Sequence, residues 1–423
     1  MIVSAAFAGK RYAVYGLARS GRATVAALAA SGAEVWAWDD KAEARASVDV
    51  PLVDPMTADL TGLDGLVVSP GVPLNTHPLA GRARAAGVPI IGDIELFAIA
   101  RLTLPAHKVV GITGTNGKST TTALIHHLLA QAGRQARLGG NIGLPILAQA
   151  PLPEGGIYVL ELSSFQIDLT LSLDCEVAVL LNITPDHLDR YDGFEAYAAS
   201  KARLFSMQSA AHVAVVSAES APSRAIADAL GRAVLIRAAD IADQSAWPSL
   251  QGPHNAENVA AACAAVRALG LTEDEIDAGL RSYPGLPHRM ERIAVKRGVL
   301  FVNDSKATNP TSTAPALAAY PHIHWIVGGL NKTDELDACL PHLGHVRAAY
   351  VIGAAADLFA GLLRPHVPVV VGESVAKATR LAAEAARDGE VVLLSPACAS
   401  YDQFTDFEAR GAAFREAVGG LPQ

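Results

Sequence analysis

A glycine-rich loop that contains a lysine has the most direct chemistry in the sequence. Residues 113–120 read Thr-Gly-Thr-Asn-Gly-Lys-Ser-Thr, between a predicted strand and a predicted helix. In such a loop, backbone N–H groups can surround phosphate oxygens, Lys118 can reach the β and γ phosphates, and Ser119 can ligate magnesium. Ile112 stands where the strict phosphate-loop pattern has its first glycine. A turn that merely joins a strand to a helix would not need the lysine, so the segment predicts nucleotide binding.

Polar segments follow the next two buried strands that we predict. Glu161 begins Glu-Leu-Ser-Ser-Phe-Gln, and His187 lies within Asn-Ile-Thr-Pro-Asp-His-Leu-Asp at 182–189. Because α/β sheets bind ligands at the carboxyl ends of their strands, both side chains are expected to meet above the phosphate loop, around magnesium. Two plainer interpretations stay open, His187 as a loop histidine that caps backbone carbonyls and Glu161 as a surface acid.

A second glycine turn lies near the N-terminus. Gly16 and Gly21 belong to a loosened dinucleotide fingerprint in which Ala18 replaces the middle glycine. The pattern would direct backbone N–H groups and a helix N-terminus at a diphosphate, and Asp39, near the end of the second strand, could hold a ribose hydroxyl. A tight strand-to-helix turn also needs small residues, so diphosphate binding and a plain turn both remain open.

These motifs require a framework of strands and helices, and the apolar runs predict one. Strands are predicted at Tyr12–Tyr15, Glu34–Trp38, Leu66–Val68, Val88–Ile91, Lys108–Thr113, Tyr158–Leu160, Val177–Leu181, Val213–Val216, Leu300–Val302, Trp325–Val327, Ala349–Ile352 and Val391–Leu394. Helices are predicted at Arg22–Ser31, Ser119–Ala132 and Asn255–Leu269. Alternation of this kind favours the α/β class, with parallel sheets and helices on both faces. At about 150 residues per domain, the 423 residues leave room for roughly three domains.

The amino-acid composition indicates which kinds of ligand the protein can bind and in which cellular compartment it works. Lys and Arg number 34 against 42 Asp and Glu, for a net charge of -8, which argues against a nucleic-acid binder. The four cysteines form no C-x-x-C pair and favour a reducing cytosol. With no apolar run long enough to span a membrane, the sequence predicts a soluble cytoplasmic protein.

Several long motifs together resemble the ATP-dependent Mur ligases. They are Gly114–Thr120, Glu161–Ser164, Asp186-His187 and His254–Asn258, and, for the branch that adds D-glutamate, Gly140–Gly143, Asn303–Asn309 and Ser395–Phe404. The resemblance covers nearly the whole chain.

The resemblance implies three domains, which are a UDP-binding Rossmann-like domain at 1–95, a central P-loop ATPase domain with a parallel sheet at 96–285, and a C-terminal glutamate-binding Rossmann-like domain at 286–423. It implies an ATP-dependent ligase that forms the C–N bond between D-glutamate and UDP-N-acetylmuramoyl-L-alanine through an acyl phosphate. That step belongs to cytoplasmic peptidoglycan synthesis, and hence to cell-wall biogenesis, cell shape and cell division. We expect a monomer acting on these small molecules.

The resemblance also implies individual roles. Catalytic residues are expected to be Lys118, Glu161, His187, Lys201 and Arg289. ATP contacts are expected from Gly114, Thr115, Asn116, Gly117, Lys118, Ser119, Thr120, Asn258, Arg289 and Asp304. Substrate contacts are expected from Ser20, Ser69, Asn141, Ser163, Lys306, Thr308, Lys332, Ser400 and Phe407. Magnesium, as two ions, is expected at Ser119, Glu161, His187 and Lys201.

Lys201 matches the lysine that the family carries as a carbamate. An ammonium group beside magnesium would be repelled, whereas a carbamate reverses the charge and becomes a ligand. Without the resemblance, a surface lysine on an amphipathic helix is the plainer interpretation.

The sequence differs from the family pattern at two places, and two alternative functions stay open. Asp40-Lys41 stands where relatives often carry Thr-Arg near uracil, and the stretch from Ala218 to His254 looks short. The alternatives are another Mur-type or folylpolyglutamate-type ligase with a different amino acid, and a nucleotide-dependent regulatory module without ligase activity.

Overall fold

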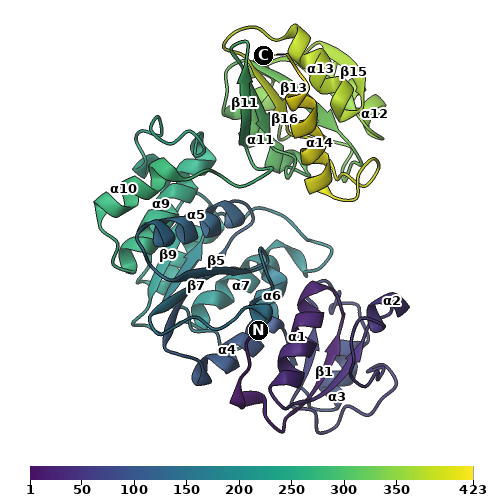
Figure 1. Ribbon diagram of the computed structural model, residues 1–423, viewed down its shortest axis with the longest axis vertical. Coiled ribbons are helices and arrows are strands. Elements are labelled where there is room, and N and C mark those ends of the chain that lie inside the picture. Colours follow the sequence, from purple (N-terminus) through teal and green to yellow (C-terminus); the bar gives the residue numbers. More distant parts are fainter. Residues whose placement is uncertain (423) are drawn as a thin grey trace. The chain divides into compact units, whose positions relative to one another are not determined.

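The computed structural model describes residues 1–422 and arranges them as three β-sheets flanked by helices (Figure 1). The chain divides into two compact units. One contains residues 1–241 and 257–280, and the other contains residues 242–256 and the chain from 281 onward. The first two sheets belong to the first unit, and the third sheet belongs to the second. The mixed α/β class with parallel sheets is thereby confirmed.

The first sheet has four parallel strands. Their order is β2 (Glu34–Trp38), β1 (Arg11–Tyr15), β3 (Gly65–Val68) and β4 (Ile90–Ile91). Because side chains alternate along a strand, Tyr12 and Val14 share a core with helix α1 (Arg19–Ala30), whereas Ala13 and Tyr15 share one with α3 (Leu79–Ala85). Each face of this sheet is therefore covered by a helix.

The second sheet has six parallel strands. Their order is β10 (Val234–Ile236), β9 (Val213–Ser217), β8 (Val177–Leu180), β5 (His107–Thr113), β7 (Gly156–Glu161) and β6 (Ala136–Gly140). β5 lies between β7 and β8, with Ile112 opposite Glu161 and Thr113 opposite Leu180. The loop after β5 thus lies between the strand ends that lead to Glu161 and to the His187 segment.

The third sheet also has six strands. Their order is β11 (Glu291–Lys296), β12 (Val299–Asn303), β16 (Val391–Leu394), β13 (Ile323–Gly328), β14 (Val346–Ile352) and β15 (Val369–Glu373). β11 pairs antiparallel with β12, and the other pairs are parallel. Helices α11 (Pro310–Ala318) and α12 (Ala356–Leu363) share a core with one face, and α13 (Val375–Ala385) and α14 (Phe407–Gly419) share a core with the other.

The remaining helices complete the described chain. They are α2 (Ala42–Arg45), α4 (Asp93–Ala100), α5 (Lys118–Gln131), α6 (Ser164–Asp168), α7 (Gly193–Ser206), α8 (Ala221–Leu230), α9 (Pro253–Ala268) and α10 (Glu273–Ser282). Every predicted strand and helix overlaps an observed one, and α5 and α9 begin and end within two residues of their predicted bounds. Among residues 1–422, no helix is both long enough and apolar enough to cross a membrane.

A buried arginine ties together two loops of the third sheet. Arg410 of α14 is 1% exposed, and its guanidinium donates to the hydroxyl and carbonyl oxygens of Ser305 at 3.0 and 2.8 Å. It also donates to the carbonyl oxygens of Cys398 at 3.0 Å and Ala399 at 3.1 Å. Because burial disfavours the cation, the pKa of Arg410 falls to about 10. The side chain therefore fixes the loops after β12 and β16 to each other.

Replacing Arg410 by methionine should destabilise the second unit. Four buried oxygens would lose a charged donor, and an unsatisfied buried polar group costs about 1–3 kcal/mol, so we expect a loss of about 3 kcal/mol in urea unfolding. Arg415→Met is the matched control on the same helix, because Arg415 has a half-exposed side chain that pairs with Glu291. The control should change stability by less than about 1 kcal/mol. Equal effects of the two substitutions would contradict the assignment.

Candidate active site

The glycines of the phosphate loop are required by their surroundings. Gly117 has a φ of +84°, and a Cβ there would lie 2.2 Å from Oδ1 of Asn258. Gly114 has a φ of +152°, and a Cβ there would lie 2.9 Å from the Leu181 Cβ. The Thr121 hydroxyl donates to the same Asn258 Oδ1 at 3.2 Å. Loop, helix α5 and Asn258, all predicted to contact ATP or to lie beside it, are therefore in direct contact.

The loop is held against the segment that follows β8. The backbone N–H of Thr115 donates to the Asn182 carbonyl at 2.7 Å, and that of Asn116 donates to Asn182 Oδ1 at 2.9 Å. The Thr115 hydroxyl donates to the Thr184 carbonyl at 3.2 Å. Ser119 is buried in the first turn of α5, and Thr120 beside it is half-buried. The loop conformation thus depends on the same segment that contains His187.

Two lysine side chains meet at one backbone carbonyl. Both Lys118 Nζ and Lys201 Nζ donate to the Gly114 oxygen at 2.9 Å, and Lys118 Nζ also donates to the Thr115 oxygen at 2.7 Å. Lys201 is 1% exposed, and its Nζ lies 4.6 Å from the Tyr197 ring centroid. Burial, followed by repulsion from Lys118, holds the pKa of Lys201 well below its usual value. The interpretation of Lys201 as a surface lysine is therefore wrong.

Glu161 ends β7 as a buried acid. Its side chain is 2% exposed, so the interpretation as a surface acid is wrong as well. Oε1 accepts from Asn141 Nδ2 at 2.9 Å, whereas Oε2 has no hydrogen-bond partner among the described residues. A buried carboxylate oxygen without a donor fits a hard cation such as Mg²⁺, which prefers oxygen ligands. Asn141, a predicted substrate contact, is held beside it.

His187 lies in the segment that follows β8, and its ring is close to Phe165 of α6, the helix that follows Glu161. Its φ is +54°, its ring centroid lies 4.8 Å from that of Phe165, and about half of its side chain is exposed. Partial burial and the cations of Lys118 and Lys201 lower the pKa of His187, although Asp186 opposes them. The lowered pKa favours the neutral imidazole, which is the form that can ligate a metal ion.

Ser163, another predicted substrate contact, has a local role. It is the N-cap of α6, where its hydroxyl accepts from the Gln166 N–H at 3.2 Å and the Gln166 side chain reciprocates. The hydroxyl thus helps to begin the helix that follows Glu161.

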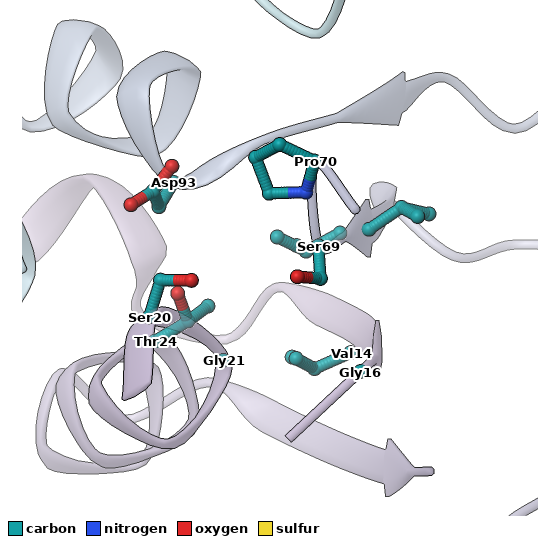
Figure 2. Close-up of a pocket in the computed structure, with 10 residues that line it drawn as sticks. Val14, Gly16, Ser20, Gly21, Thr24, Ser69, Pro70 and Asp93 are labelled. Atoms are coloured by element: carbon teal, nitrogen blue, oxygen red, sulfur yellow. The ribbon is translucent and has the colours of Figure 1, made fainter. Parts of the chain in front are cut away.

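The N-terminal glycine turn borders a pocket. Gly16 has a φ of +97°, and a Cβ there would lie 2.7 Å from the Ser69 Cβ; a Cβ on Gly21 would lie 1.8 Å from the Gly16 oxygen. Close packing therefore requires both glycines. Ser20 and Ser69, both predicted to contact substrate, line the same pocket together with Asp93, which the sequence analysis did not single out (Figure 2). The turn interpretation of this motif is confirmed, and diphosphate binding stays a prediction.

Asp39 supports this turn directly. One carboxylate oxygen accepts from the Leu17 N–H at 2.6 Å and the other accepts from the Lys41 N–H at 2.9 Å. Asp39 lies just after β2, as predicted. In the structure its carboxylate binds backbone N–H groups of the chain, and its contact with a ribose hydroxyl stays a prediction.

In the second unit, Asp304 is buried in a polar setting. Its carboxylate oxygens accept from the Met290 N–H at 3.2 Å and from the Ser395 hydroxyl at 2.7 Å. Burial raises its pKa to about 7, against the lowering effects of Ser395, Met290, Arg289 and Arg410. Arg289 is thus within electrostatic range of Asp304, as expected for two predicted nucleotide contacts.

The predicted glutamate contacts lie in several loops of this unit. Lys306 Nζ is 4.1 Å from the Phe407 ring centroid, so these two are together. Ser400 is buried, Thr308 is half-buried, and Lys332 is exposed. Arg410 holds the loops that contain Lys306 and Ser400.

Comparison with known proteins agrees with these motifs. The profile of the Mur ligase middle domain matches residues 112–247, and that of the Mur ligase glutamate ligase domain matches residues 288–398. The UDP-N-acetylmuramoylalanine–D-glutamate ligase of Novosphingobium aromaticivorans is 61% identical, covering 100% of this chain and 97% of that protein. The enzyme of the same name from Sphingopyxis alaskensis is 58% identical, covering 100% of both.

Solved structures support the fold. UDP-N-acetylmuramate-alanine ligase from Thermotoga maritima superimposes with a TM-score of 0.57 at 17% identity, covering 97% of this chain and 99% of that chain. The UDP-N-acetylmuramoylalanyl-D-glutamyl-2,6-diaminopimelate–D-alanyl-D-alanyl ligase of Acinetobacter baumannii gives a TM-score of 0.60 at 17% identity, covering 87% and 92%. Because full-length relatives share well over half of its residues, the chain belongs to the Mur ligase family.

Proposed function

We propose that the chain is an ATP-dependent ligase that joins D-glutamate to UDP-N-acetylmuramoyl-L-alanine. Full-length identity of 61% with a relative named for that reaction carries the proposal. The phosphate loop, two lysines on the Gly114 carbonyl and a buried Glu161 agree with ATP chemistry. A different Mur-type or folylpolyglutamate-type specificity remains the alternative, and the amino acid used distinguishes it.

The reaction poses a problem of charge. A carboxylate is a poor electrophile, so its oxygen first attacks the γ phosphorus of ATP, which forms an acyl phosphate and releases ADP. The uncharged amine of D-glutamate then attacks the acyl carbon, phosphate leaves, and the amine loses its proton. Lys118 and the loop N–H groups stabilise the negative charge on the transferred phosphoryl group. None of these residues forms a covalent bond to substrate, so positioning and charge stabilisation account for catalysis.

Magnesium fits the donors at this edge of the sheet. Ser119, Glu161 and His187 would hold it, together with Lys201 as a carbamate, and two ions are proposed. Magnesium would supply positive charge that offsets the repulsion among phosphate oxygens. Carbamylation needs an uncharged amine that attacks CO₂ and releases one proton, and the lowered pKa of Lys201 favours that amine.

Other roles are proposed from motif positions. Asn258, Arg289 and Asp304 would contact the nucleotide. Ser20, Ser69, Asn141 and Ser163 would contact the UDP-linked substrate, and Lys306, Thr308, Lys332, Ser400 and Phe407 would contact D-glutamate. The corresponding division is a UDP-binding Rossmann-like domain at 1–95, an ATPase domain at 96–285 and a Rossmann-like glutamate domain at 286–423. We further propose that the protein acts in the cytoplasm as a monomer in peptidoglycan precursor synthesis.

The proposed reaction predicts a specific requirement for D-glutamate. Phosphate release from ATP should depend on both UDP-N-acetylmuramoyl-L-alanine and D-glutamate, with little release when L-glutamate, meso-diaminopimelate or L-alanine is supplied instead. Mass spectrometry should identify the amide product. Faster turnover with another amino acid would favour the alternative ligase, and absence of turnover with any of them would favour a regulatory module.

Lys118→Ala should nearly abolish ligation and leave the fold intact. The loss removes a cation from the phosphate site, and loss of one such charge-stabilising donor costs about 10²–10³ in kcat. Lys108→Ala is the matched control, because Lys108 is an exposed lysine near the beginning of the same strand β5. Thermal unfolding should be similar for both variants. Wild-type turnover of Lys118→Ala at saturating ATP would exclude the assigned role.

Lys201→Ala should lose most activity, and added acetate should restore part of it. The substitution removes the proposed carbamate, and a small carboxylate could occupy the same space with the same charge. A direct test uses ¹³C-bicarbonate, which should give a carbamate carbonyl NMR signal in the wild type and in Lys108→Ala but not in Lys201→Ala. Full activity of Lys201→Ala without acetate, or absence of that signal in the active wild type, would reject the carbamate.

A further inference from the structure

Asp93 is a buried carboxyl group that faces the N-terminal pocket. It is the first residue of α4 and is 6% exposed, and its Oδ1 has no hydrogen-bond partner among the described residues. Figure 2 shows the carboxyl group on the same side of the pocket as Ser20 and Thr24, with Ser69 across the space. Asp93 lines the pocket, and a buried polar atom that the chain leaves without a partner needs one from a bound molecule.

The charge around the pocket determines what that atom can be. Asp93 is the one titratable side chain among the residues that line the pocket. Charged residues on or near the elements packed around it are engaged elsewhere or exposed. These are Arg19, bound to the Gly143 carbonyl, Arg22, exposed on α1, Asp39, bound to the backbone N–H groups of Leu17 and Lys41, Glu95, bound to backbone N–H groups at 171 and 172, and Arg101, paired with Glu176. Burial raises the pKa of Asp93 to about 6, although the N–H groups of Ile94 and Asp93 oppose the shift.

The rest of the pocket favours an anion. The N-terminus of α1, a helix of 12 residues, supplies backbone N–H groups and the positive end of the helix dipole. The N–H groups of Gly16 and Leu17 in the glycine turn are bonded to the Trp38 carbonyl and to Asp39. An ionised Asp93 would repel an anion held there, whereas a protonated one would donate a hydrogen bond to it. An anion can therefore bind beside Asp93 in this pocket only when the carboxyl group is protonated.

We propose that Asp93 binds the diphosphate of the UDP-linked substrate in its neutral form, as a hydrogen-bond donor to a phosphate oxygen. This inference rests on the proposed function, which supplies the diphosphate. Since the bound anion stabilises the protonated acid, the pKa of Asp93 rises further on binding. Near neutral pH, where the free carboxyl group is mostly ionised, binding therefore takes up a proton. Affinity falls as pH rises above the pKa of the free protein.

Calorimetry with UDP-N-acetylmuramoyl-L-alanine tests this coupling in the full chain. Titrations in buffers of different ionisation enthalpy, from about pH 6 to about pH 8.5, give the number of protons taken up. Neither the diphosphate diester nor the carboxylate of this ligand titrates in that range. We expect uptake approaching one proton per ligand near pH 7.5, and a Kd that rises by up to about tenfold per pH unit above pH 6.

Asp93→Asn distinguishes a donor from an acceptor. The amide keeps an N–H donor of similar shape without a charge, so Kd should become independent of pH, proton uptake should vanish, and binding near pH 8 should be at least as tight as in the wild type. Glu95→Gln is the matched control, because it neutralises the other buried acid of α4 and should leave proton uptake unchanged.

Three results would overturn the inference. Wild-type binding without proton uptake would exclude it while leaving the proposed ligase function intact, and this measurement does not depend on how well any variant folds. Binding weakened tenfold or more near pH 8 by Asp93→Asn would mean that an ionised Asp93 accepts a hydrogen bond from the ligand. No binding of this ligand by the wild type would exclude both the inference and the proposed function.

Discussion

The carbonyl oxygen of Gly114 is the point on which the central site depends. Two lysine ammonium groups, Lys118 from α5 and Lys201 from α7, donate to it at the same distance of 2.9 Å. Two cations this close repel each other strongly where little water screens them. The arrangement is favourable when anions are brought to it, or when one amine gives up its charge. A phosphate loop and a lysine of lowered pKa are thus two consequences of one geometry, which the parallel order β8, β5, β7 creates by bringing three strand ends together.

Much of this geometry could be predicted from the sequence, because the central strands are continuous apolar runs. The strands that were missed, β6, β10, β11 and β15, are the edge strands of the second and third sheets. Each is partly exposed. β6 and β11 lack an uninterrupted apolar run, and β11, for example, reads Glu-Arg-Ile-Ala-Val-Lys. β10 and β15 contain the apolar runs Val-Leu-Ile and Val-Val-Val although much of each is exposed, so an apolar run by itself does not report how deeply an edge strand is buried.

The site residues divide in the same way. Motifs and strand order located the glycines at 114 and 117, Glu161 at the end of β7 and His187 in the segment after β8. The burial of Lys201 also left a signal, because Tyr197, Lys201 and Leu204 fall on one face of α7 with the buried Ser200. Asp93 left none that distinguished it. An acid in the first turn of a helix is common because the helix dipole favours it, and only the fold shows that this acid is buried and lines a pocket.

The two glycine turns of the first unit resemble each other in backbone arrangement but differ in the charge of the side chains around them. Each follows the first strand of its sheet, and each leads into the start of a long helix, α1 or α5. At Gly114 two lysines supply positive charge, which suits a phosphoryl group whose charge changes during reaction. At Gly16 the pocket holds hydroxyl groups and one buried acid, with no basic side chain among its lining residues. The diphosphate that we propose for this pocket would be held and not transferred, so hydrogen bonds matter more to it than a change of charge. The neutral carboxyl group proposed for Asp93 would supply one of these hydrogen bonds and would make the binding depend on pH.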